Sequence, residues 1–252
     1  MSNNIIVRDA VLGDLHYAET ITTEMAESAK ARGTGIAKRS PEYIQQKIEE
    51  GKAVIAVTED GTWVGFCYIE AWENSQYVAN SGLIVSPPFR KSGVAREIKR
   101  KVFELSRKKY PDAKIFGLTT GLAVMKINSE LGYEPVTYSE LTNDDQFWKG
   151  CQSCVNYDIL MSKQRKNCLC TGMLFDPAEH AKKQAEKVRS FVNEEGELEE
   201  HKKREFEGNF KLFDRWVKFK QFVLLKAFGK KAEGEQPSEK KNNSILNLFF
   251  FW

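Results

Sequence analysis

Residues 85–95, with the sequence VSPPFRKSGVA, decide how the central part of the chain folds. A β-rich run over 77–85 predicts a strand that ends at the two prolines, because proline has no N–H to donate to a sheet. Beyond the loop, apolar residues recur at helical spacing over 94–105, and Pro111 closes the predicted helix. The first amides of a helix have no internal acceptor and carry partial positive charge, so this loop suits a diphosphate group.

Small residues and cations in the same loop favour that interpretation. Gly93 and Ala95 let the backbone approach phosphate oxygens closely, and Arg90 and Lys91 add positive charge. A basic turn that leads into an ordinary surface helix explains the same residues, so the loop by itself leaves both interpretations open.

Working outward, short β-rich runs alternate with amphipathic stretches from residue 4 to 176, the pattern of an α/β or α+β domain. Asp60-Gly61 between two such runs predicts a hairpin, and Ser40 before Pro41 predicts a helix start. The predicted strands are 5–7, 53–57, 63–71, 77–85, 114–118 and 133–138, and the predicted helices lie near 15–25, 41–51, 94–110 and 122–131.

In this context residues 90–95 resemble the acetyl-CoA loop of the GNAT superfamily of N-acetyltransferases, whose pattern is Arg or Gln, two residues, Gly, one residue, Gly or Ala. Arg90, Gly93 and Ala95 fit the pattern. The likeness extends over roughly residues 5–160 and implies a mixed central sheet flanked by helices. It also implies acetyl-CoA or succinyl-CoA as co-substrate. The cofactor-binding residues carried over by the resemblance are Leu83, Ile84, Val85, Arg90, Lys91, Ser92, Gly93, Val94, Ala95 and Asn128.

Two further stretches, 27–41 and 118–128, are similar to bacterial N-acylglutamate synthases of arginine biosynthesis. That likeness implies a small acidic amino acid, glutamate first, as acceptor of the acyl group. Two alternatives stay open: a non-catalytic acyl-CoA sensor, and an acetyltransferase that acts on a protein or another amine.

The family reaction is direct attack of an amine on the thioester, so a carboxylate should lie near the cleft to take the proton of the ammonium. Glu70 is the candidate, and a solvated glutamate at a strand end is the competing interpretation. The resemblance places a backbone amide near Ile84 or Val85 at the developing oxyanion. Many members carry Tyr where this chain has Asn128, which can donate a hydrogen bond to the sulfur but cannot supply a proton.

Cations gather between the first two predicted helices, in the loop that roofs the acceptor site in this family. Arg32, Lys38 and Arg39 are the predicted substrate-binding residues, with Lys30 beside them, because Arg pairs bidentately with carboxylates. A solvated basic loop explains the same residues.

Four of the five cysteines form two close pairs, Cys151 with Cys154 and Cys168 with Cys170. Four thiolates at this spacing could hold a structural zinc ion, although a single residue between the second pair is less usual. Thiols that bind nothing are the alternative.

Composition and charge set the remaining expectations. A net charge of +3 does not argue for nucleic acid, and the absence of a signal peptide or spanning segment favours a cytoplasmic protein. We expect an acyltransferase domain over 1–176 with a Cys-rich end at 151–170, a charged helical extension over 177–231, and a polar linker with an apolar tail over 232–252. The extension is expected to pack on the domain or on a second copy in a homodimer rather than on a membrane surface.

Overall fold

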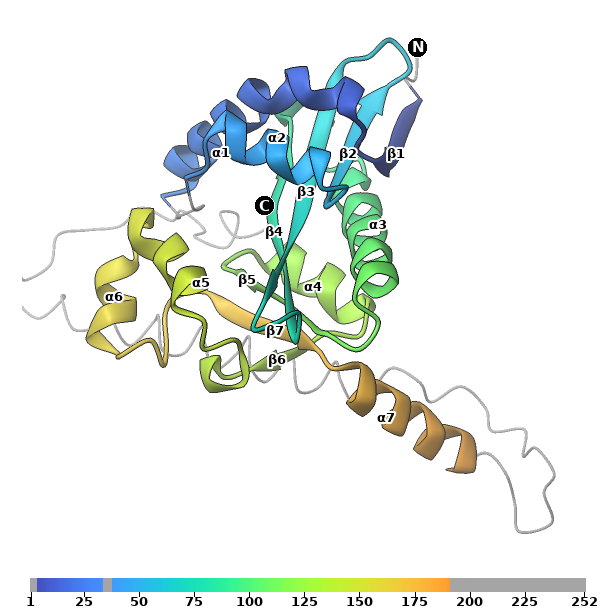
Figure 1. Cartoon of the computed structure of the whole chain (residues 1–252), viewed down its shortest axis with the longest axis vertical. Helices are drawn as coiled ribbons and strands as arrows, with labels where there is room; N and C mark the ends of the chain where they lie inside the picture. Colours follow the sequence, from blue (N-terminus) through green and yellow to red (C-terminus); the bar gives the residue numbers. More distant parts are fainter. Residues whose placement is uncertain (1–3, 34–37, 191–252) are drawn as a thin grey trace, which may run out of the picture. The chain divides into compact units, whose positions relative to one another are not determined.

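The structure is a computed structural model that describes residues 4–33 and 38–190. The described residues form a twisted sheet with helices around it (Figure 1). The strands are β1 (Ile5–Asp9), β2 (Ala53–Thr58), β3 (Trp63–Trp72), β4 (Tyr77–Val85), β5 (Lys114–Thr119), β6 (Glu134–Val136) and β7 (Thr171–Phe175). The α-helices are α1 (Ala18–Arg32), α2 (Pro41–Glu49), α3 (Val94–Lys109), α4 (Leu122–Glu130), α5 (Asp145–Lys149), α6 (Tyr157–Ser162) and α7 (Pro177–Ser190). The 3-10 helices are η1 (Leu12–Tyr17), η2 (Pro87–Phe89), η3 (Tyr138–Glu140) and η4 (Gly150–Ser153).

The sheet is mixed, with the strand order β1-β2-β3-β4-β5-β7-β6. Strands β1 to β4 pair antiparallel, β4 and β5 pair parallel, and β7 lies antiparallel between β5 and β6. The predicted fold class is confirmed.

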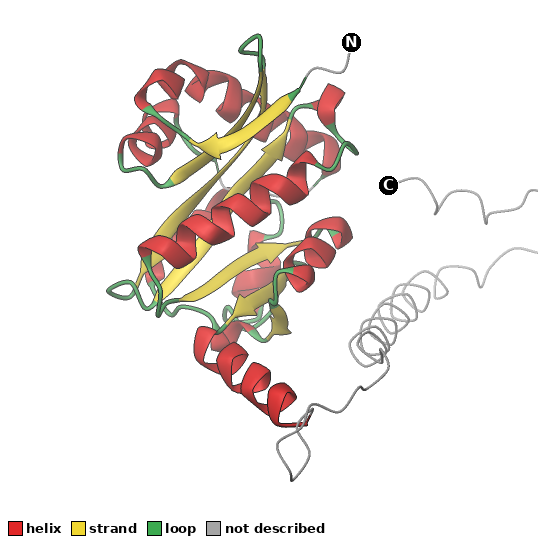
Figure 2. Cartoon of the chain, turned by 90° about the vertical axis from the view of Figure 1, so that its right-hand side faces the viewer, coloured by secondary structure: helices red, strands yellow, loops and turns green. Residues whose placement is uncertain are grey.

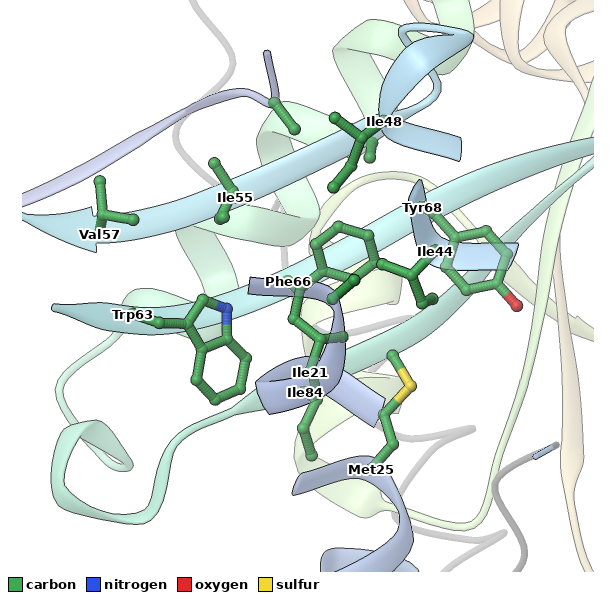
Figure 3. Packing of buried hydrophobic residues seen from close by; sticks show 13 residues of the cluster. Ile21, Met25, Ile44, Ile48, Ile55, Val57, Trp63, Phe66, Tyr68 and Ile84 are labelled. Atoms are coloured by element: carbon green, nitrogen blue, oxygen red, sulfur yellow. The ribbon is translucent and has the colours of Figure 1, made fainter. Parts of the chain in front are cut away.

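Helices cover both faces of the sheet because alternate residues of each strand point to opposite faces. The helices α1 and α2 pack on one face through Ile21, Met25 and Ile44, which meet Phe66 and Tyr68 of β3 (Figure 3). The amphipathic helix α3 lies across the other face (Figure 2), where Ile98 approaches the backbone of Gly65.

Several predicted elements agree with the structure. Strand β4 has the predicted bounds, and α2 begins at Pro41, with the Ser40 hydroxyl accepting a hydrogen bond from the Tyr43 amide. The hairpin at Asp60-Gly61 joins β2 to β3.

Other predictions were wrong. The loop between the first two helices was expected to include Lys30 and Arg32, but α1 continues to Arg32 and ends at Gly33, whose φ is +59°. The last predicted strand, 133–138, is reduced to β6 because a 3-10 helix begins at Tyr138. Strand β7 and the short helices of 138–162 were not predicted.

The chain divides after Arg189 into two units, and all that follows concerns the first. Within it α7 contacts the sheet through His180, whose ring lies 5.0 Å from that of Phe175. No helix of the described residues is both long and apolar enough to cross a bilayer. Most of the predicted extension and all of the predicted apolar tail lie outside the described residues.

Candidate active site

The site begins where two parallel strands stop pairing. Strand β4 pairs with β5 only over Tyr77–Ala79, whereas β5 pairs with β7 as far as Thr119. From Asn80 to Val85 the β5-facing edge of β4 therefore has no partner strand among the described residues. An unpaired strand edge offers N–H and C=O groups to an extended ligand.

A β-bulge reshapes the same half of β4. Phe66 pairs with Ile84 and Tyr68 with Ser81, so two β4 residues stand opposite Cys67 alone. One of the two is Gly82, with φ at +67°. Bulges bend a strand and increase its twist, which accounts for the departure of β4 from β5.

The bulge and the pairing that follows it decide which β4 amide faces the free edge. The Ser86 N–H donates to the Val64 carbonyl, so Gly65 and Val85 form a pair that exchanges no hydrogen bonds. The N–H and C=O of Val85 consequently point away from β3, whereas those of Ile84 point toward it. Of the two amides predicted for the oxyanion, Val85 has the required direction.

The loop after β4 presents backbone amides, as predicted. Lys91 has φ at +65° and Gly93 has φ at +90°, and no side chain caps the start of α3. The amides of residues 91–95 have no acceptor in the described part of the chain. The first hydrogen bond of the helix runs from the Arg96 N–H to the Gly93 carbonyl, at 2.9 Å. These residues fit a diphosphate, because a helix N-terminus with free amides binds anions.

The Arg90 side chain does not stand at the loop rim, where it was expected to add charge. Its Nε donates to the Val85 carbonyl at 3.0 Å, and its guanidinium contacts Glu24 at 2.8 Å and the Ser28 hydroxyl at 2.7 Å. Arg90 thus ties the loop to α1, whereas Lys91 is exposed.

Asn128 is almost fully buried on α4, with an exposed fraction of 2%. Its side-chain oxygen has no hydrogen-bond partner in the structure. A buried carbonyl oxygen without a partner costs roughly 1–3 kcal/mol, so this amide is a candidate to meet a ligand.

The predicted base, Glu70, lies in a polar network on the α2 side of the sheet. Its carboxylate accepts a hydrogen bond from Tyr43 Oη at 2.5 Å and pairs with Lys47 Nζ at 3.1 Å. In register it stands opposite Ala79, the last β4 residue that pairs with β5. Glu70 therefore lies beside the point where the strands part, but with two donors already on its carboxylate.

Arg39 is held in the same network. Its Nε donates to Tyr68 Oη at 3.0 Å, and its guanidinium carbon lies 4.9 Å from the centre of the Tyr43 ring. Burial raises the pKa of Tyr68 and of Tyr43, so both hydroxyls stay protonated at neutral pH. Lys38 is exposed, and the Arg32 side chain lies outside the described residues.

Tyr43, Lys47 and Tyr68 were not predicted. Tyr43 and Lys47 are four residues apart on α2, and Tyr68 and Glu70 are two apart on β3, so each pair shares a face. The spacing within each pair was the sequence signal that could have pointed to these residues. What the pattern could not show is that the two faces meet.

The four predicted metal ligands line a single small cavity of about 20 Å³ in the segment between β6 and β7. Burial raises the pKa of Cys151 to about 11 and that of Cys170 to about 12. As they stand, the described residues contain no group of three or more His, Cys, Asp or Glu side chains arranged to hold a metal ion.

A comparison with family models finds one match in this part of the chain. Residues 22–123 match the model of the acetyltransferase (GNAT) family, a range that includes the bulged strand, the amide loop and the network around Glu70. The fold and the site define a domain of the acyl-CoA-dependent N-acyltransferases. Residues 22–123 are thus the part of the chain that the acetyltransferase (GNAT) family model describes.

Solved structures with a likeness to the chain have low identity. N-acetylglutamate synthase from Neisseria gonorrhoeae, complexed with coenzyme A and N-acetyl-glutamate, is 16% identical, with a TM-score of 0.49 over 70% of this chain and 36% of that one. A Mycobacterium tuberculosis protein in complex with CoA and NLQ is also 16% identical, with a TM-score of 0.49 over 68% of this chain and 98% of that one. Phosphinothricin acetyltransferase from Sinorhizobium meliloti, in complex with AcCoA, is 17% identical, with a TM-score of 0.46 over 68% and 88%.

The chain thus spans about a third of the gonococcal synthase and nearly all of the mycobacterial protein. A comparison with curated protein sequences finds no significant match.

Proposed function

We propose that the domain moves an acyl group from acetyl-CoA or succinyl-CoA to the amino group of a small acidic amino acid, with glutamate as the first candidate. The observation that carries the acceptor class is Arg39, a half-buried guanidinium fixed in place by Tyr68 and Tyr43. A guanidinium held in one orientation pairs bidentately with a carboxylate at little further cost in side-chain entropy.

Tyr68 connects this cation to the acyl-transfer end of the site. Its hydroxyl meets Arg39, and its ring packs so closely on the β4 bulge that a Cβ at Gly82 would come within 2.5 Å of it. A carboxylate on Arg39 would therefore lie about one tyrosine side chain away from the free edge of β4. That spacing suits an amino acid whose amine must reach a thioester at this edge.

Glu70 is the proposed base for the ammonium, directly or through a water molecule. The ion pair with Lys47 and the hydrogen bond from Tyr43 hold its carboxylate in one orientation. Glu70→Gln keeps the shape and removes the proton acceptor, so kcat should fall by a factor of about 10² to 10⁴ with the KM for glutamate little changed. A kcat within a few-fold of the wild-type value assigns Glu70 to a structural role.

Acyl-CoA would be held by backbone groups. The free amides of residues 91–95 would bind the diphosphate, the Val85 N–H would face the developing oxyanion, and the side-chain N–H of Asn128 would donate to the sulfur. The reaction itself forms an amide bond and breaks the thioester, and the thiol leaves with the proton taken from the amine.

The test is release of free thiol from acetyl-CoA and succinyl-CoA in the presence of a panel of amino acids. Arg39→Ala should raise the KM for glutamate roughly 10- to 100-fold, the value of a charged hydrogen-bonded contact of about 1.5–3 kcal/mol. Arg100→Ala is the matched control, because Arg100 is an exposed α3 arginine paired with Glu97 and Glu104.

An unchanged KM in Arg39→Ala refutes the acceptor proposal. Thiol release with a neutral amine or a protein but with no acidic amino acid also refutes it. Uptake of acyl-CoA without release for any amine would favour the sensor alternative.

A further inference from the structure

The segment between β6 and β7 has little regular structure of its own. It contains η3, α5, η4 and α6, and the longest of these has six residues. Its aromatic residues Tyr138 and Trp148 pack on the sheet with Leu160. Elements this short bury little surface each, and small segments of this kind are commonly fixed by a disulfide or a metal ion.

Its four cysteines come from two places in the sequence and meet at one cavity. Cys151 and Cys154 lie at the turn formed by η4, and Cys168 and Cys170 lie directly before β7. All four line the cavity of about 20 Å³, which has room for roughly one water-sized particle. An organic ligand is far too large for it, whereas a single ion is not.

The remaining lining of the cavity suits a thiolate-bound cation. It consists of aromatic and aliphatic side chains and Asn156, with no Asp, Glu, Lys or Arg among the described residues that line it. The Asn156 amide donates to Cys154 Sγ at 3.4 Å, so the backbone already places a donor on a sulfur that would carry negative charge. The Tyr138 hydroxyl donates to the Cys170 carbonyl at 2.9 Å and fixes the second pair.

We propose that Cys151, Cys154, Cys168 and Cys170 bind one zinc ion in a tetrahedral site. Zinc is the divalent ion that four thiolates suit best in a structural site closed to other ligands. Because the thiols are not yet gathered around one point, binding requires their side chains to turn into the cavity. Zinc sites of this kind form together with the local structure.

The zinc site would also brace the acceptor side of the active site. The Lys38 N–H donates to Ser153 Oγ at 3.0 Å, and Ser153 stands between Cys151 and Cys154. Lys38 in turn precedes Arg39. Loss of zinc should therefore raise the KM for the acceptor and leave acyl-CoA binding unchanged. This effect on KM rests on the proposed function, whereas zinc binding itself does not.

The experiment is elemental analysis of the full chain, purified without a metal-binding tag under reducing conditions. One zinc per chain is expected, and a thiol-specific mercurial should release it to a chromogenic chelator. Cys154→Ser should lose the zinc. Cys67→Ala is the matched control, because Cys67 is buried on β3 and does not line the cavity, and it should keep the zinc.

A second measurement does not depend on the folding of a variant. The wild-type chain grown with cobalt in place of zinc should show the visible absorption of a tetrahedral thiolate site. A zinc content near zero, four alkylatable thiols in zinc-replete protein, or two disulfides detected by mass spectrometry would each overturn the proposal.

Discussion

Replacing Gly82 by alanine tests the geometry on which the site depends. The backbone of Gly82 has φ at +67°, a conformation that costs an L-residue about 1–2 kcal/mol. The added Cβ would lie 2.5 Å from Tyr68 Cε1 and 2.9 Å from Met25 Cε. Neither neighbour can retreat easily, because Tyr68 is 2% and Met25 4% exposed (Figure 3).

The expected loss of stability combines the two effects. Displacing buried side chains in a packed core costs about 1–3 kcal/mol, so with the backbone cost the variant should lose roughly 2–5 kcal/mol. That is a large share of the roughly 5–15 kcal/mol that stabilises an ordinary domain. In molecules that still fold, movement of Tyr68 would displace Arg39 and raise the KM for the acceptor.

Urea unfolding followed by tryptophan fluorescence measures the loss, and two other glycines separate its causes. Gly61 also has a positive φ, +84°, but its Cβ would meet nothing nearer than 3.8 Å, so Gly61→Ala should cost only the backbone share of about 1–2 kcal/mol. Gly121 has φ at −87° and contacts no closer than 3.6 Å, so Gly121→Ala should stay within about 0.5 kcal/mol. If Gly82→Ala is no less stable than Gly61→Ala, the close packing of Tyr68 on the bulge is refuted.

Three further outcomes are expected. Asn128→Leu removes the unpaired buried oxygen, so its free energy of unfolding, measured with urea, should rise by roughly 1 kcal/mol. The same variant should turn over more slowly in the thiol assay, and a stable variant with full turnover would show that Asn128 is not part of the site. Arg8→Ala should cost roughly 1–2 kcal/mol at neutral pH, whereas the exposed Arg100→Ala should change stability little. The hydrogen bond with Arg8 lowers the pKa of Asp14, so the stability that this pair contributes is fully present above the pKa of an unfolded Asp, near 3.9, and is lost as the pH falls through the pKa of folded Asp14. If the urea midpoints of wild type and Arg8→Ala stay equally far apart down to pH 2, this expectation is contradicted. Burial lowers the pKa of Lys99, so Lys99→Met should be at least as stable as the wild type at pH 7. Any gain should shrink as the pH rises toward about 10.4, the pKa of an unfolded Lys. A clear loss of stability at pH 7 would mean that the hydrogen bond to Asn80 outweighs the cost of burying the charge.

Local signals in the sequence predicted the elements that frame the proposed acyl-CoA site. Two prolines end β4, a glycine with positive φ starts α3, and a Ser-Pro pair starts α2. Each depends on the conformation of a few neighbouring residues, so a linear pattern is sufficient.

What the sequence could not supply depends on contacts between distant segments. Strand β7 is a five-residue run, TGMLF, buried on both faces, which shows no alternation to mark it as a strand. Its insertion between β5 and β6 follows from long-range pairing alone. In the same way Arg90 was expected to meet phosphate, but its carboxylate partner, Glu24, is 66 residues away in the sequence.

The position of the free β4 edge restricts what can bind there. An exposed strand edge normally invites pairing with another chain, and the outer edges of this sheet are β1 and β6. The unpaired half of β4 instead lies inside the sheet, between β3 and the diverging β5, so a second protein edge cannot approach it broadly. A single extended chain that enters end-on can reach it, and the pantetheine arm of coenzyme A is such a chain. The bulge at Gly82 accompanies the loss of pairing along this edge. On the proposed function, the amides of 91–95 would hold the other end of the same ligand, so the two features would act on one molecule.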